Sequence, residues 1–246
     1  MSFCWTLVDQ TSTAAQADLD HIVEAISLLD QRFADAWGLV GSHGVASTDP
    51  QQVVGASIIF YLKSSDPNVP NALGFHDEQG DTPYVEILVD IIKQNGGGWL
   101  RSNGSGASVA SVVAHEFFET RCDEFCGSWE YIPSRDLFLA RETCDPCQAV
   151  MLQVQTSDGT TVELSDAVLP RFFDAQAPSD GSVAFDLAGA VTAPFQLLPQ
   201  GYGIYYDPNA SQASRITSVW GDKMPDWIRA MKIANARSRT SRRLKK

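Results

Sequence analysis

Hydrophobic and polar positions alternate along this chain with two periods, one typical of helices and one typical of strands. From Asp18 to Trp37, apolar residues recur every three or four positions, which predicts an amphipathic helix. Short apolar runs predict strands at Phe3–Val8, Val53–Leu62 and Pro83–Ile92. This mixture of elements predicts an α+β protein with a mixed sheet.

The C-terminal half has a weaker pattern. Val150–Gln155 and Thr160–Leu164 flank Ser157-Asp158-Gly159, an arrangement that predicts a β-hairpin. Residues 175–215 are rich in Pro, Gly, Ala and Ser, which predicts loops with short strands. Trp220–Ala236 reads as a last helix, which Pro225 is expected to break.

Another helix is predicted from about Ser108 to Arg121. Glycine-rich stretches interrupt the chain before it, and either Ser105 or Ser108 can serve as its N-cap. Its apolar residues cover a surface wide enough for a buried helix, namely Val109, Val112, Val113, Phe117 and Phe118. Polar groups among such residues are costly to bury unless they have partners, so the polar residues of this helix are candidates for a site.

The polar residues of that helix form the sequence His115-Glu116-x-x-Glu119. His115 and Glu119 are four residues apart, so they project from one helix face, one turn above the other. This is the arrangement of H-E-x-x-H zinc peptidases, with Glu in place of the second His. We therefore expect His115 and Glu119 to bind zinc, with Glu116 as the general base. The alternative is an amphipathic helix whose glutamates face water.

A zinc site of this kind needs a third protein ligand from outside the helix, with water in the fourth position. The downstream candidates are Asp123, Glu142 and Asp145. Asp123 lies where the helix is expected to end, so it could instead cap or turn the chain. We favour Asp145 as the third ligand, with Glu142 as the second choice.

The cysteines offer a rival explanation for the same region. Cys122 and Cys126 are four positions apart, and Cys144 and Cys147 are three apart. Four thiolates at such spacing could hold a structural zinc, form two disulfides, or remain free thiols. No N-terminal signal peptide is visible, so we expect synthesis in the cytoplasm, which argues against obligatory disulfides. A zinc held by the cysteines would leave His115 and Glu119 without a metal role.

The chain has 246 residues, of which 44% are hydrophobic, enough to bury the core of one large domain. No apolar run reaches the roughly 18 residues that a membrane span needs. The formal net charge is −12, but eight basic and no acidic residues follow position 228. Residues 1–228 therefore hold 10 basic and 30 acidic residues, a charge of −20. We predict one domain at 1–228 and a basic C-terminal tail at 229–246.

Several motifs resemble a group of zincin-like proteins from tailed phages, prophages and bacteria. That group carries H-E-x-x-E followed by E-x-x-D-x-C, which His115, Glu116 and Glu119, then Glu142, Asp145 and Cys147, match. Further landmarks recur in the same order, at Trp37-Gly38, Ala72–Asp77, Val168–Phe173, Ala193–Phe195 and Gly201-Tyr202. The Asp-Pro that usually follows the helix is Asp123-Glu124 in this chain.

The resemblance implies a zincin-like fold, a metal site on the H-E-x-x-E helix and a loop-rich C-terminal half. It also implies two alternative functions. One is a zinc-dependent peptidase that uses Glu116 as its base. The other is a structural virion protein of the capsid, neck or tail, with a structural or vestigial metal site. In the host cell, such a protein would be made in the cytoplasm and assembled with other virion subunits.

The basic tail favours a binding role. Six positive residues lie within its last ten positions, namely Arg237, Arg239, Arg242, Arg243, Lys245 and Lys246. We expect such a tail to contact nucleic acid or an acidic neighbouring subunit, and not a membrane. The alternative is a tail that only increases solubility.

Three further expectations concern the surroundings of the site. His76 lies in the turn-like Gly74-Phe75-His76-Asp77, so it either lines the site or is an exposed loop residue without a role. Tyr202, like Tyr205 and Tyr206, could stabilise an oxyanion, although packing is the simpler explanation. Pro83–Ile92 is the candidate edge strand along which a zincin would align an extended substrate.

Overall fold

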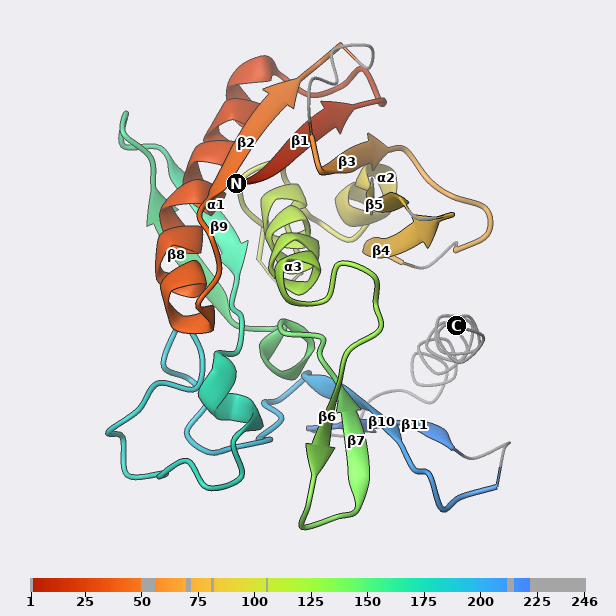
Figure 1. The fold of residues 1–246 in the computed structure, drawn as a ribbon. Coiled ribbons are helices and arrows are strands. Elements are labelled where there is room, and N and C mark those ends of the chain that lie inside the picture. Colours follow the sequence, from red (N-terminus) through yellow and green to blue (C-terminus); the bar gives the residue numbers. More distant parts are fainter. Residues whose placement is uncertain are drawn as a thin grey trace. The chain divides into compact units, whose positions relative to one another are not determined.

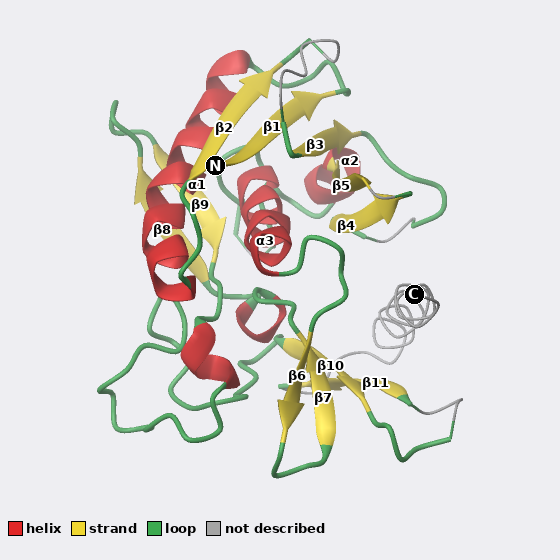
Figure 2. Cartoon of the chain, viewed as in Figure 1, coloured by secondary structure: helices red, strands yellow, loops and turns green. Residues whose placement is uncertain are grey.

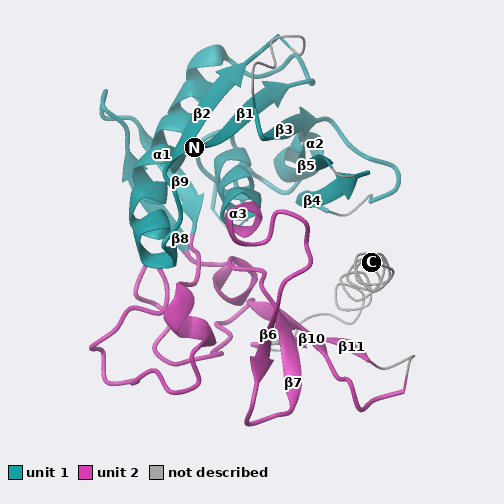
Figure 3. Cartoon of the chain, in the orientation of Figure 1, with its two compact units in different colours: residues 1–118, 151–165 teal, residues 119–150, 166–246 magenta. Residues whose placement is uncertain are grey.

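A computed structural model of the chain describes residues 2–49, 56–69, 72–80, 82–104, 106–211 and 215–221. The chain divides into two units, each with its own internal contacts (Figure 3). Unit 1 comprises residues 1–118 and 151–165, and unit 2 comprises residues 119–150 and 166–246. The chain thus enters unit 2, returns to unit 1 for one short segment, and ends in unit 2.

Unit 1 contains a five-stranded sheet with the order β2-β1-β3-β5-β4 (Figure 1). Its strands are β1 (Phe3–Asp9), β2 (Ser42–Ser47), β3 (Ile58–Lys63), β4 (Gly74–Gln79) and β5 (Thr82–Leu88). The first three strands and β5 pair in parallel, whereas β4 pairs antiparallel with β5 at the edge of the sheet. The sheet thus has one edge strand that runs against the others.

The helices of unit 1 are α1 (Gln16–Trp37), α2 (Val89–Gln94) and the larger part of α3 (Val109–Cys122). Helix α1 ends at Gly38, whose φ of 65° suits a residue without a Cβ. Aromatic side chains join the helices to the sheet. The ring of Phe117 in α3 lies 4.9 Å from that of Trp5 in β1, and Phe118 lies 4.6 Å from Phe33 in α1. Helix α3 is therefore fixed in the core of unit 1.

The start of α3 is fixed by reciprocal hydrogen bonds between two serines. The Ser111 N–H donates to Ser108 Oγ at 3.0 Å, and the Ser108 N–H donates to Ser111 Oγ at 2.9 Å. This is the geometry of a capping box, with Ser in place of the usual Glu. The structure thus confirms Ser108 as the N-cap, while Ser105 lies outside the described residues.

Unit 1 is completed by an antiparallel hairpin. Its strands are β8 (Met151–Gln155) and β9 (Thr161–Ser165), and both contact α1. The hairpin was predicted from the two apolar segments around Ser157-Asp158-Gly159, and the structure confirms it.

Unit 2 contains a four-stranded antiparallel sheet with the order β11-β10-β7-β6. The strands are β6 (Trp129–Ile132), β7 (Leu137–Ala140), β10 (Tyr202–Tyr206) and β11 (Ile216–Trp220). Two short 3-10 helices precede β10, namely η1 (Asp145–Cys147) and η2 (Pro170–Phe173). Between η2 and β10 the chain forms loops and turns, apart from an isolated bridge at Asp186 (Figure 2).

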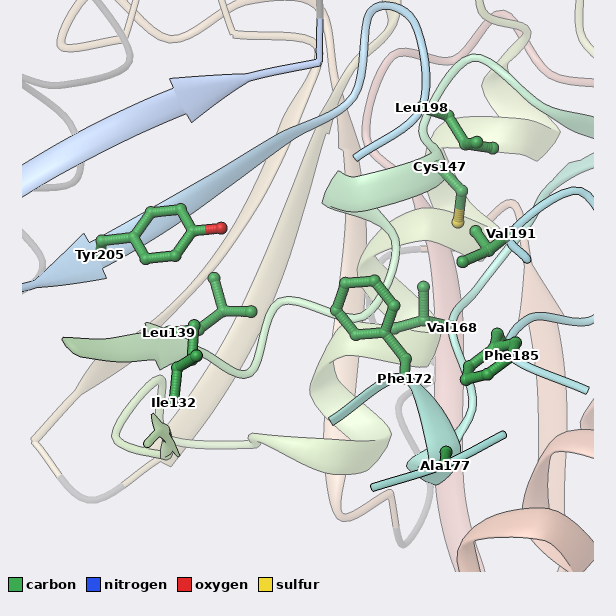
Figure 4. Close-up of a cluster of buried hydrophobic side chains, with 10 residues drawn as sticks. All are labelled: Ile132, Leu139, Cys147, Val168, Phe172, Ala177, Phe185, Val191, Leu198 and Tyr205. Atoms are coloured by element: carbon green, nitrogen blue, oxygen red, sulfur yellow. The ribbon is translucent and has the colours of Figure 1, made fainter. Parts of the chain in front are cut away.

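The core of unit 2 joins one face of this sheet to the loops. Leu139 and Tyr205 come from the sheet, whereas Cys147, Phe172 and Phe185 come from η1, η2 and the loop that follows (Figure 4). Tyr205 is thus a packing residue, as the simpler of the two expectations had it. Half of the buried residues of this core lie outside helices and strands, so their positions depend on how the loops are held.

Three of the predicted elements need correction. The strand predicted at Val53–Leu62 begins only at Ile58, as β3, and residues 53–55 lie outside the described part of the chain. The apolar run Pro83–Ile92 was expected to be one strand, but the strand β5 ends at Leu88 and α2 begins at Val89. The same run was the candidate edge strand, whereas β5 lies inside the sheet and β4 forms the edge. Trp220 ends a strand, and the rest of the predicted helix Trp220–Ala236 lies outside the described residues.

The mixed α+β class is confirmed by three helices and three separate sheets among the described residues. In that part of the chain, no helix is both long enough and apolar enough to cross a membrane. The predicted boundary between a domain at 1–228 and a tail at 229–246 stays a prediction, because residues 222–246 are outside the description.

Candidate metal centre

The predicted shared face of the H-E-x-x-E helix is present in α3. Candidate ligand atoms of His115 and Glu119, which are one helical turn apart, lie within 4.8 Å of one another. The side chain of His115 is half-buried, and Glu116 and Glu119 are buried. The alternative, a helix whose glutamates face water, is therefore wrong.

In unit 2, Glu119 contacts the segment 142–145, which contains the predicted third ligands. The backbone N–H of Cys144 donates to Glu119 Oε1 at 3.3 Å. Candidate ligand atoms of Glu119 and Cys144 also lie within 4.8 Å of one another. The hydrogen bond holds one carboxylate oxygen of Glu119 against the start of η1.

The two favoured third ligands belong to this same buried cluster. Glu142 and Asp145 are each only 3% exposed. Tyr202 of β10 hydrogen-bonds to Asp145, and burial, followed by the negative charges of Asp145 and Glu119, raises its pKa well above the usual value. The charge of Glu142 acts in the same direction. Three carboxyl groups thus act on one tyrosine. Among the described residues, however, the donor atoms close enough to share a metal are those of His115, Glu119 and Cys144, or of His76, Glu116 and Glu119, so neither Glu142 nor Asp145 completes such a group.

Asp123, the third candidate from the sequence, has a different role. Its Oδ1 accepts hydrogen bonds from the backbone N–H groups of Gly127 at 2.7 Å and Ser128 at 3.0 Å. These bonds turn the chain after α3, as the alternative for Asp123 proposed. We therefore assign Asp123 to the turn and not to the metal.

Cys144 is a donor that the sequence analysis did not consider for this site. It was assigned only to a four-cysteine cluster, although it lies between Glu142 and Asp145 in the chain. Burial, with the charge of Glu119 as a smaller cause, raises the pKa of its thiol well above the usual value. The thiol is therefore protonated at neutral pH unless a cation binds beside it.

The four clustered cysteines do not form disulfides. Cys122, Cys126, Cys144 and Cys147 are all free thiols, so the disulfide alternative is wrong for this structure. Among the described residues, the groups of side chains that could hold a metal do not unite the four cysteines. Burial raises the pKa of the Cys122 and Cys147 thiols, which favours the neutral form.

In unit 1, Glu116 has a partner that the sequence analysis placed in a turn. His76 lies in the strand β4, its side chain is fully buried, and its Nδ1 is 3.0 Å from Glu116 Oε2. The expectation of an exposed loop histidine is therefore wrong. The sequence signal for this pair was weak, because 40 positions separate the two residues.

The donor types of the centre fit zinc. Imidazole nitrogen, carboxylate oxygen and thiolate sulfur are the ligands that Zn²⁺ takes in proteins, usually four in a tetrahedron. Oxygen-only donors would suit Ca²⁺ or Mg²⁺ better, but His115 supplies nitrogen and Cys144 can supply sulfur. A bound divalent cation would also reduce the cost of burying the carboxylates of Glu119, Glu142 and Asp145.

Six basic residues predicted to bind a partner lie outside the described residues, namely Arg237, Arg239, Arg242, Arg243, Lys245 and Lys246.

Comparison of the chain with models of protein families, with curated proteins and with solved structures found no match.

Proposed function

We propose that this chain is a zincin-like metal-binding protein that acts as a zinc-dependent peptidase. Zinc would be held by His115 and Glu119 of α3 and by a third ligand from the segment 142–145. The observation that carries the proposal is the placement of His115, Glu116 and Glu119 on one capped helix, with the donor atoms of His115 and Glu119 within 4.8 Å.

The sheet of unit 1 supports a zincin-like fold. In zincins, an edge strand next to the catalytic helix aligns an extended substrate by adding it to the sheet. Here β4 is such an edge strand, and it packs on α3 through Gly74 and His76. An added Cβ at Gly74 would lie 2.7 Å from Val112 and 3.3 Å from Glu116 of that helix. Glycine thus permits the close approach of the strand to the site.

The chemistry proposed for the chain's own residues follows from their types. When bound, zinc lowers the pKa of a coordinated water and polarises the scissile carbonyl. Glu116 accepts the proton of the attacking water and passes it to the leaving amine. Glu119 would be a ligand, and the Cys144 N–H holds its Oε1 in place.

The ligand charges set an expectation for the rate. Two carboxylate ligands place more negative charge on zinc than the two histidines of H-E-x-x-H enzymes do. With such ligands, zinc would be a weaker Lewis acid and would activate water less strongly. We therefore propose a slow or specialised peptidase, with a structural metal site in a virion protein as the second candidate function.

Elemental analysis of the purified full chain tests the metal site. We expect about one zinc per chain in the wild type and almost none in His115→Ala. His43→Ala is the matched control, because His43 is an exposed histidine of β2 and should have no effect on zinc. Equal zinc in the wild type and in His115→Ala would contradict the proposal and place the metal elsewhere, for example on the cysteines.

A second experiment tests the chemistry. Glu116→Gln should keep the zinc but abolish peptide cleavage, because the amide cannot accept the proton of the water. Cleavage of a broad peptide library, with and without a chelator, gives the readout. If the zinc-loaded wild type cleaves nothing, the peptidase proposal fails and the structural role is favoured.

A further inference from the structure

We propose that His76 is a positioning residue that orients the carboxylate of Glu116. This inference rests on the proposed function, since it assigns a role in the step that Glu116 performs. Its basis is the buried contact between an edge strand, β4, and the helix that carries the site, α3.

The position of His76 in the sheet is unusual for a polar residue. Strand pairing aligns it with Val85, which pairs with Phe60, which in turn pairs with Leu7. All four side chains are fully buried in this row across the sheet. An apolar residue would complete the row at no desolvation cost, whereas a buried imidazole costs free energy unless it is hydrogen-bonded. His76 therefore requires an explanation beyond core packing.

The contact between His76 and Glu116 supplies that explanation. His76 Nδ1 lies 3.0 Å from Glu116 Oε2. In the proposed role Glu116 is an ionised base that only accepts, so the Nδ1–H of His76 would donate. Fixing one oxygen sets the rotation of the carboxylate and therefore the direction of the second oxygen, Oε1. Such fixation holds a general base in the orientation in which it meets its proton.

Gly74 shows that the contact is close along the strand as well. It lies on the same face of β4 as His76, because the two are two residues apart. Its backbone leaves no room for a side chain beside Val112 and Glu116 of α3. The strand thus contacts Glu116 at His76 and passes close to it at Gly74, and a peptide added to the outer edge of β4 would bind to the strand that orients the base.

Two substitutions separate orientation from packing. His76→Leu gives an apolar side chain like those of the rest of the row but removes the donor. His76→Asn keeps an amide N–H near the position of Nδ1. We expect His76→Leu to lower kcat by about 10- to 100-fold, as loss of an orienting hydrogen bond at a metal site typically does. KM and zinc content should stay near the wild-type values, and His76→Asn should restore a large part of kcat. His43→Asn, at an exposed position, is the control.

Three outcomes would overturn the inference. Unchanged kcat in His76→Leu would make the pair structural. Equal loss in His76→Leu and His76→Asn would exclude the donated hydrogen bond as the cause. Loss of zinc from both variants would make His76 a ligand.

A readout without activity separates this inference from the proposed function. Ring-nitrogen NMR spectra of the full chain should show the proton of neutral His76 on Nδ1, and Glu116→Ala should change that signal while His43 stays the same. An unchanged His76 signal in Glu116→Ala would contradict the inference even if the protein binds zinc and cleaves peptides. Conversely, unchanged zinc in His115→Ala would contradict the proposed function but would not contradict the His76–Glu116 contact.

Discussion

The two units differ in how buried carboxylates accept backbone N–H groups in their loops. In unit 1, the sheet and helices pair N–H groups with backbone carbonyls, and the buried Asp9 accepts three N–H groups in the turn before α1. In unit 2, buried aspartates accept hydrogen bonds in the loops. Asp166 Oδ1 accepts from the N–H groups of Ala167, Leu187 and Ala188 at 2.8–3.1 Å. Asp186 Oδ2 accepts from two more, at 2.9 and 3.0 Å.

These two aspartates also contact each other. Both side chains are at most 1% exposed, and the nearby Asp186 adds to burial in favouring a proton on Asp166, which raises its pKa. Burial, followed by the contact with Asp186, raises the pKa of Asp166 to about 8. The difference teaches that the loops of unit 2 depend on the ionisation state of Asp166, whereas the surroundings of α3 in unit 1 depend on apolar packing.

The largest expected effect breaks the packing of unit 1. Phe117→Ala removes a ring that packs against Trp5 and Phe60, so it should lower the free energy of unfolding by about 4 kcal/mol. Urea unfolding, with hydrogen exchange resolved by peptide, gives the magnitude and the place. The loss should be the same at pH 5 and pH 8, and faster exchange confined to unit 2 would contradict the comparison.

The second effect breaks the support of the unit 2 loops. Asp166→Ala leaves the N–H groups of Ala167 and Ala188 without this acceptor and that of Leu187 with the Ala167 carbonyl alone, at an expected cost of about 3 kcal/mol. Asp180→Ala is the control, since the exposed Asp180 accepts one bond from the Ser182 N–H and its loss should cost less than about 1 kcal/mol. Equal losses in the two variants would refute a special role for the buried carboxylate.

The third effect is the pH dependence of unfolding. Asp166 keeps its proton in the folded protein up to about pH 8, whereas the unfolded chain releases it near the usual value of 3.8. The folded state therefore binds more protons between these pH values. The contribution of Asp166 to the free energy of unfolding is fully present below pH 3.8 and is lost as the pH rises to about 8. The slope can reach about 1.4 kcal/mol per pH unit. Asp166→Asn should flatten the pH profile of urea unfolding, and an unchanged profile would argue against the raised pKa of Asp166.

The smallest effect sharpens the comparison within α3. Ser108→Ala removes the acceptor for the Ser111 N–H, so it should cost about 1 kcal/mol, independent of pH. Thermal unfolding followed by circular dichroism measures the change. Ser102→Ala is a suitable control, because Ser102 uses its backbone N–H for its bond to Glu163. A loss as large as that of Phe117→Ala would show that the cap does more than begin the helix.

The same contrast explains what the sequence could predict. The helices α1 and α3, the strand β1 and the hairpin β8–β9 follow from local periodicity, and so does the shared helix face of His115 and Glu119. The strand β5 was predicted with a wrong end, because its apolar run continues into α2 without a polar break.

The missed features depend on residues far apart in the chain. In β4, Gly, His and Asp stand where a strand usually shows apolar alternation, so the segment resembled a turn until its pairing with β5 was known. His76 finds Glu116 40 positions away, and Asp166 finds Leu187 21 positions away. No local sequence pattern predicts such distant partners. The strands β6, β7 and β11 of unit 2 were missed, whereas β10 lies within 175–215, where short strands were expected.

The central claim is that α3 and the segment 142–145 hold one zinc ion. Zinc K-edge X-ray absorption of the full chain, loaded with one equivalent of zinc, tests it most directly. The account predicts a shell of nitrogen and oxygen at about 2.0–2.2 Å with at most one sulfur at about 2.3 Å, from Cys144. A shell of four sulfur atoms at about 2.3 Å would place the metal on the cysteines and contradict the account.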